Sequence, residues 1–192
     1  MGTDIHAVWQ KKSPSGRWEE IPSNWKQERH YNLFAVLADV RNGFGFAGIL
    51  TGEAVKPISS PRGLPEDFEV DDYYTDAVNK HWMGDHSFSW LSGEEMLAYS
   101  LPSVIKTGII SRSAYDAWDK KKSPATWSAD ITGRHVITIN DSLIEKQLFP
   151  NWTHIRVEWD GELKKELKYF FDEVARLVRL HKKIRLVFGF DS

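Results

Sequence analysis

The chain has 192 residues, of which 25 are basic and 27 acidic, giving a formal net charge of -2 and a sequence pI of about 6.4. This near balance excludes a protein that binds nucleic acid through overall positive charge. The 41% hydrophobic content and the absence of Cys predict one globular domain over residues 1–192, without disulfides, Cys-bound metals or Cys nucleophiles.

The N-terminal part predicts a β-hairpin followed by a short helix. Residues 5–21 contain two strand-like stretches separated by a Pro- and Gly-containing turn at residues 13–16. Asn32 is expected to cap a helix over residues 33–40 by accepting backbone N–H groups, and Gly43 is expected to end that helix.

The middle of the chain is less regular. Residues 46–72 are rich in Gly, Pro and Ser and have neither helical nor strand periodicity, which indicates a long loop over a site. A helix is expected near residues 71–80. Ser92, with Glu95 three residues later, matches a capping box and predicts a helix over residues 93–100.

Residues 103–150 show only weak periodicity. They predict a short helix near residues 113–120 and a strand at residues 135–139. We therefore expect this part of the chain to be a variable, insertion-like region.

The C-terminal part has the clearest pattern. Apolar residues recur at helical spacing between residues 162 and 181, and strands at residues 155–159 and 184–190 flank them. Together with the N-terminal hairpin, this strand–helix–strand predicts an α+β (or α/β) fold, a single domain with helices packed on a central β-sheet. No run of about 18 apolar residues and no signal-like start occur, so we expect a cytoplasmic protein with no membrane partner.

Two groups of acidic and imidazole side chains could act together. Asp4 and His6 lie two residues apart on a predicted strand, so their side chains leave the same face. Asp85, His86 and Ser87 lie in a predicted loop, where they could supply a ligand, a general base or only the hydrogen bonds of a turn. Taken singly, each group is also common among solvent-exposed side chains that have no function. If they converged, their two carboxylates and two imidazoles would suit Mn, Fe or Zn.

Arginines form a second set of candidates. Arg29 precedes the first predicted helix, Arg41 follows it, and Arg62 lies between prolines in the long loop. A planar guanidinium can bind a phosphate through two hydrogen bonds, and the helix N-terminus at Asn32 adds partial positive charge. Each arginine could equally pin a loop to the rest of the protein. The aromatic residues that could stack on a base, or pack in the core, are Trp90 and Tyr73.

Five segments of the sequence resemble a family of proteins found in bacteriophages and prophages. In chain order they read GTDIH from Gly2, RHYNLFAVLADVRN from Arg29, PRGLP from Pro61, DHSFSWL from Asp85 and RLVFGFD from Arg185. His30 departs from the pattern, where Arg or Asn is expected before the following Tyr. The resemblance implies a phage origin and a location in the cytoplasm of the infected bacterial host.

The leading hypothesis is a binding protein that needs no cofactor. The sequence lacks a P-loop, a GxGxxG between strand and helix, an HExxH and a GxSxG motif, so no complete catalytic motif is present. The expected ligand is a small phosphorylated, nucleotide-derived molecule, such as a cyclic nucleotide or an ADP-ribose derivative, that a phage protein could sequester from a bacterial antiviral system. The expected ligand-binding residues are Arg29, Asn32, Arg41, Arg62, Tyr73, Asp85, His86, Ser87 and Trp90.

Two alternatives stay open. One is a metal-dependent phosphoesterase or nuclease, in which Asp4, His6, Asp85 and His86 hold Mn or another divalent metal and Arg62 stabilises the phosphoryl charge. The other is a non-enzymatic factor that binds a host protein, with the same polar residues fastening loops to the sheet. No partnership with long nucleic acid is expected, and a homo-oligomer is expected if one ligand is enclosed between subunits.

Overall fold

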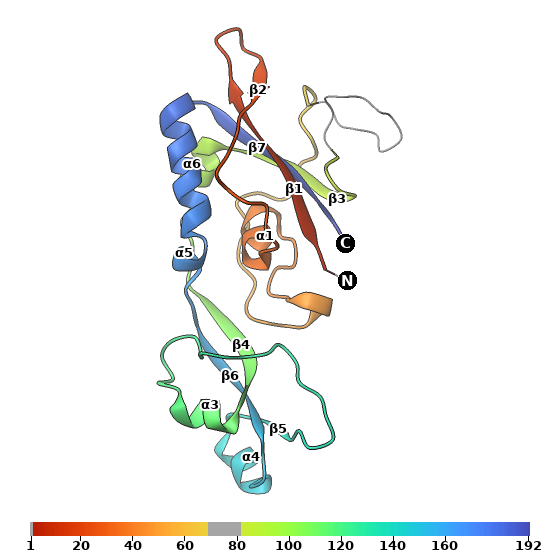
Figure 1. The fold of residues 1–192 in the computed structure, drawn as a ribbon, viewed down its shortest axis with the longest axis vertical. Helices are drawn as coiled ribbons and strands as arrows, with labels where there is room; N and C mark the ends of the chain where they lie inside the picture. Colours follow the sequence, from red (N-terminus) through yellow and green to blue (C-terminus); the bar gives the residue numbers. More distant parts are fainter. Residues whose placement is uncertain (1, 69–81) are drawn as a thin grey trace. The chain divides into compact units, whose positions relative to one another are not determined.

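The computed structural model describes residues 2–68 and 82–192, and its contacts divide the chain into two compact units. The first unit comprises Met1–Asn42, Val55–Leu101 and Lys164–Ser192, and the second comprises Gly43–Ala54 and Pro102–Leu163. Each unit contains a β-sheet with helices (Figure 1). The α+β class predicted from the sequence is therefore confirmed, with two sheets where the sequence predicts one, whereas the single domain stays a prediction.

The sheet of the first unit has the order β2-β1-β7-β3, and its neighbouring strands are antiparallel. The predicted N-terminal hairpin is present, with Gly16 at a φ of 84° in its turn. Asp4 lies opposite Asp191, so the first and last strands bring the two termini of the chain to the same end of the sheet (Figure 1). The strands are β1 (Asp4–Lys12), β2 (Trp18–Glu20), β3 (His86–Ser92) and β7 (Ile184–Asp191).

Capping residues set the ends of α1 and α2 in the first unit, and one predicted cap is wrong. The N-cap of α1 is His30 and not Asn32, and the backbone N–H of Leu33 donates to the His30 ring at 3.4 Å. The helix ends well before Gly43, because Asp39 adopts a left-handed conformation with a φ of 63°. The helices are α1 (Tyr31–Ala38), α2 (Gly93–Ala98) and α6 (Lys168–His181), and α2 has the predicted Ser92–Glu95 capping box.

Both faces of the first sheet are covered by apolar side chains. Phe34 of α1 meets Phe190 of β7 edge to face at 5.1 Å, and Phe170 of α6 packs against Trp9 of β1. On the other face, Phe68 from the long loop packs with core residues of β1 and β7. Within its described part, residues 46–68, that loop contains no helix or strand beyond the 3-10 turn η1 (Phe46–Gly48).

The second unit has its own sheet and its own core. The order is β4-β6-β5, with β4 and β6 antiparallel and β5 and β6 parallel. Tyr115, Trp152 and Ile155 are among the buried residues of its core. The predicted strand–helix–strand is therefore present, but its strands β6 and β7 belong to different sheets. The elements are β4 (Val104–Ser111), α3 (Arg112–Ala117), β5 (Thr138–Asn140), α4 (Leu143–Leu148), β6 (His154–Gly161) and α5 (Leu163–Glu166), whose last residues belong to the first unit.

Candidate functional site

The predicted pair Asp4 and His6 lies near the end of the first sheet where the termini meet. Arg29 donates two hydrogen bonds to the Asp4 carboxylate, at 2.9 and 2.6 Å, and this pairing lowers the pKa of Asp4. His6 Nε2 lies 3.5 Å from a carboxylate oxygen of Asp191, and the His6 ring lies 4.3 Å from the ring of Trp82. Asp4 and Arg29 thus satisfy each other's charge.

A hydrogen-bond network joins Arg41 to His86 at the same end of the sheet, where the termini lie. Arg41 Nε donates to the Thr3 hydroxyl at 2.9 Å, and this hydroxyl lies 3.0 Å from that of Ser192. The Ser192 hydroxyl lies 3.0 Å from His86 Nε2, and the Ser87 hydroxyl lies 3.0 Å from His86 Nδ1. The network therefore fastens the N-terminal segment to the end of β7 and the start of β3.

The remaining predicted site residues are also held by partners within the protein. Arg62 donates to the Trp90 carbonyl at 2.8 Å and to the Glu95 carboxylate at 2.9 and 3.0 Å, and its guanidinium covers the Trp90 ring at 4.2 Å. Asn32 donates to Glu166 at 2.6 Å. These contacts fit the interpretation that Arg62 pins the loop to the protein. The guanidinium of Arg62 covers one face of the Trp90 ring, so that face is not open for stacking on a base. Tyr73 and the helix expected near residues 71–80 lie outside the described residues.

The metal-site hypothesis gains no support from this part of the chain. Asp85 is the carboxylate beside His86, with 3.9 Å between an Asp85 oxygen and His86 Nε2. Among residues 2–68 and 82–192, no group of three or more His, Asp or Glu side chains is placed to hold a metal ion. Asp4, whose carboxylate binds Arg29, is therefore not part of such a group with His6, Asp85 and His86.

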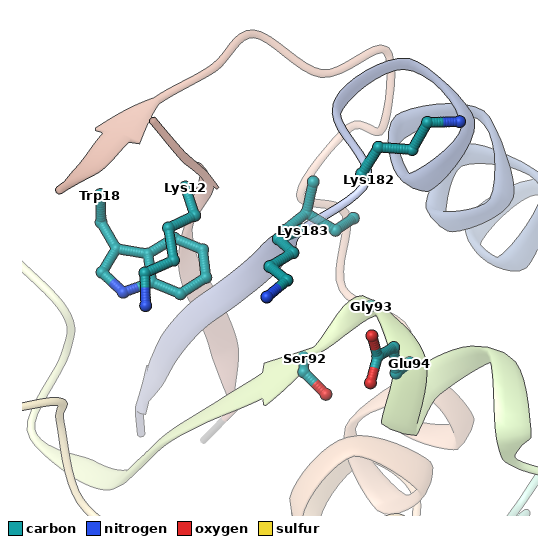
Figure 2. Close-up of a pocket in the computed structure, with 8 residues that line it drawn as sticks. Lys12, Trp18, Ser92, Gly93, Glu94, Lys182 and Lys183 are labelled. Atoms are coloured by element: carbon teal, nitrogen blue, oxygen red, sulfur yellow. The ribbon is translucent and has the colours of Figure 1, made fainter. Parts of the chain in front are cut away.

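A cavity of about 230 Å³ lies at the opposite end of the same sheet, where β1 ends and β7 begins. In Figure 2 the amines of Lys12 and Lys183 are directed toward the opening beside Trp18 and Ser92, whereas the Lys182 side chain runs the other way. We call this cavity the lysine pocket. Its lining residues are Lys12, Trp18, Ser92, Gly93, Glu94, Lys182, Lys183 and Ile184.

A strained turn directly precedes Lys183, which lies next to Lys12 where β1 pairs with the start of β7. Lys182 has φ 66° and ψ -69°, and the N–H of Lys183 donates to the His181 carbonyl at 2.8 Å. These values define a classic γ-turn, a rare conformation that is costly for a residue with a side chain. The N–H of Lys12 then donates to the Lys183 carbonyl at 2.9 Å, which joins the end of β1 to this turn.

The lysine pocket has an excess of positive charge on one side. Within residues 2–68 and 82–192, neither Lys12 nor Lys183 forms an ion pair with a carboxylate, and Glu94 is the acidic residue among those that line the pocket. Lys12 Nζ lies 5.6 Å from the centre of the Trp18 ring, and the Arg185 guanidinium lies 4.3 Å from a ring of the same indole. These contacts hold Trp18 in place as a wall of the pocket.

The lysine pocket could have been predicted from the sequence by pairing the first strand with the last. Lys12 directly follows the first predicted strand, which ends at Lys11, and Lys183 directly precedes the last one. Antiparallel pairing of these two strands would have placed both amines at one end of the sheet. The γ-turn at Lys182 has no comparable signal, because the residues that usually adopt positive φ are Gly and Asn.

A second feature is an exposed apolar face on α4 in the second unit. Leu143, Ile144 and Leu148 are 71%, 70% and 67% exposed, and Phe149 directly after the helix is 51% exposed. Large apolar side chains grouped on one exposed face are typical of protein–protein contact surfaces.

Comparisons with protein-family models, curated proteins and solved structures find no match for this chain. Within the described residues, none of the helices has the length and apolar character needed to cross a membrane. The chemistry of the lysine pocket is therefore the basis on which a function is proposed.

Proposed function

We propose that the protein binds a small phosphorylated ligand in the lysine pocket and does not turn it over. The observation that carries this proposal is the convergence on one open cavity of the amines of Lys12 and Lys183, which form no ion pair with a carboxylate in residues 2–68 or 82–192. Ammonium groups bind phosphate as charged hydrogen-bond donors, and such bonds are stronger than those between neutral groups. This assignment moves the phosphate contacts away from Arg29, Arg41 and Arg62, whose guanidinium groups have internal partners.

The pocket favours a ligand that extends beyond its phosphate. Its volume of about 230 Å³ is below the range of about 300–1,000 Å³ that encloses most of a drug-sized molecule, so part of a nucleotide would project outward. Glu94 on the rim can accept hydrogen bonds from hydroxyl or amino groups of that projecting part. A nucleotide-derived signal of the kind bacteria use against phages has both a phosphate and a projecting part with hydroxyl and amino groups. This ligand class agrees with the phage-family resemblance.

Binding titrations with Lys12→Gln and Lys183→Gln test the assignment. The probes are AMP, ADP-ribose and a cyclic dinucleotide, measured by calorimetry at low and high salt. Each variant removes one charged contact with a solvent-exposed group, so we expect about 5- to 20-fold weaker binding for each. Lys11→Gln is the matched control, because Lys11 is the adjacent residue and pairs with Glu19 at 3.7 Å.

The outcomes separate the pocket from other sites. Weakening by both pocket variants, together with unchanged binding by Lys11→Gln, supports the proposal. Equal weakening by all three variants would indicate a diffuse charge effect and would reject the pocket. A third outcome is that Arg29→Gln or Arg41→Gln abolishes binding and the lysine variants do not. The binding site would then lie at the end of the sheet where the termini meet.

A second candidate function is contact with a host protein, and the exposed face of α4 favours it. The expected partner has an apolar groove that receives Leu143, Ile144 and Leu148 as anchors. A Leu143→Ser, Leu148→Ser double variant removes two anchors at positions that are largely exposed, so the fold should be little affected. Retention of nucleotide binding with loss of a co-purified host protein would identify this second function. Unchanged co-purification would count against it.

A further inference from the structure

A second cavity lies at the other end of α2, away from the lysine pocket. Its volume is about 440 Å³, within the range of cavities that bind small organic molecules. The start of α2, at Gly93 and Glu94, lines the lysine pocket, whereas Leu97 near its end and Tyr99 after it line this groove. The complete lining is Leu97, Tyr99, Ser100, Leu101, Lys164, Lys168, Phe171 and Asp172, and we call this cavity the α2–α6 groove.

The walls of the α2–α6 groove are apolar and are held in place by the fold. The Tyr99 hydroxyl donates to the Lys56 carbonyl at 2.5 Å, which fixes the Tyr99 ring at one side. Phe171 packs edge to face on Phe170 at 5.4 Å, and Phe170 is fully buried. Leu97 is 46% exposed. The groove therefore offers a preformed apolar surface, and binding to it requires little ordering of the protein.

The charges of the α2–α6 groove leave one unpaired amine. Lys168 and Asp172 form an i,i+4 ion pair at 2.5 Å, so their charges offset each other. Lys164 lines the groove, and no carboxylate in residues 2–68 or 82–192 forms an ion pair with it. The groove thus combines apolar walls with a single positive charge.

We propose that the α2–α6 groove binds a small apolar carboxylate, with the hydrocarbon part on Leu97, Tyr99 and Phe171 and the carboxylate on Lys164. The apolar walls gain from covering a hydrocarbon, since burial of apolar surface stabilises a complex. One ammonium group matches one negative charge, which favours a carboxylate monoanion over a phosphate dianion. This proposal is independent of the lysine pocket, because the two cavities share no lining residue.

The test uses octanoate as the probe and octan-1-ol as its neutral counterpart, followed by backbone amide chemical shifts in NMR. Octanoate is expected to bind saturably, with a dissociation constant of about 1 mM or below and shifts centred on the groove. Lys164→Gln is expected to weaken octanoate about three- to tenfold and to leave octanol unchanged. Lys165→Gln is the matched control, because it removes the same charge one residue away from the groove lining. Ser100→Trp is expected to fill the groove and abolish binding of both probes.

Three results would overturn the proposal. The first is the absence of saturable binding. The second is equal weakening of octanoate by Lys164→Gln and Lys165→Gln, and the third is unchanged binding by a folded Ser100→Trp variant. The Lys12→Gln and Lys183→Gln variants should bind octanoate normally, which separates this site from the lysine pocket.

Discussion

Replacing Lys182 by Gly should stabilise the protein. Lys182 occupies a classic γ-turn with φ 66° and ψ -69°. A residue held in such a sparsely populated region costs about 1–3 kcal/mol. Gly adopts positive φ without that cost, but it loses about 0.5–1 kcal/mol more in conformational entropy on folding. The net expectation is a stabilisation of about 0.5–2 kcal/mol.

Thermal and urea unfolding followed by Trp fluorescence measure this effect. For a chain of this size, each kcal/mol shifts Tm by about 2–4 °C, so a rise of about 1–8 °C is expected. Lys182→Ala is the matched control, because it removes the side chain and retains the backbone strain. The reasoning would be refuted if Lys182→Gly were no more stable than Lys182→Ala. Both variants remove the same side chain, so the difference in stability between them reports the backbone alone.

Two further predictions concern buried polar contacts. Hydrogen bonds from Arg176, with those from the Asn24 backbone and the Ser23 hydroxyl, lower the pKa of Glu173 from 4.5 to about 2. The stability from these contacts is present above pH 4.5 and is lost as the pH falls toward 2, so Glu173→Gln should flatten the pH dependence of urea unfolding in that window. An unaltered slope would contradict this account. In the second unit, the Tyr115 hydroxyl donates to Asp141 at 2.8 Å and accepts from Lys146 at 3.0 Å. Tyr115→Phe should cost about 1–3 kcal/mol of unfolding free energy, and a cost below measurement error would show that water replaces the hydroxyl.

The sequence predicts elements well where side-chain periodicity follows burial. The terminal strands and α6 have such a pattern, since Phe170, Val174 and Leu177 recur at helical spacing and are fully buried. The strand β4 does not, because Lys106 and Gly108 interrupt its apolar run. A Cβ on Gly108 would lie 2.6 Å from the Trp127 ring, so the residue that disrupts the pattern is the one that the packing requires.

The start of strand β3 is difficult to recognise in the sequence for a different reason. The pairing of β3 with β7 shifts register between His86 and Ser89, and Ser87 has a φ of 52°. This irregularity gives Asp85, His86 and Ser87 the character of a loop in the sequence. Only the pairing with β7, nearly 100 residues later in the chain, makes this segment a strand.

The candidate site is less predictable than the fold because ionic partners are distant in sequence. Arg29 and Asp4 are 25 residues apart, and Arg62 and Glu95 are 33 residues apart. Nothing local in the sequence reveals that these guanidinium groups already have partners. In the sequence, Lys12 and Lys183 resemble ordinary surface lysines, and only the register of β1 and β7 places them together.

Sequestration of a ligand by the lysine pocket can be measured directly. The protein is incubated with cyclic dinucleotides, ADP-ribose derivatives and mononucleotides, with and without Mn²⁺, and the free pool is analysed by chromatography before and after heat denaturation. Sequestration predicts that one ligand leaves the free pool and returns intact on heating, and that the Lys12→Gln, Lys183→Gln double variant leaves the pool unchanged. A new product that requires Mn²⁺, or a pool that the wild-type protein leaves unchanged, would contradict it.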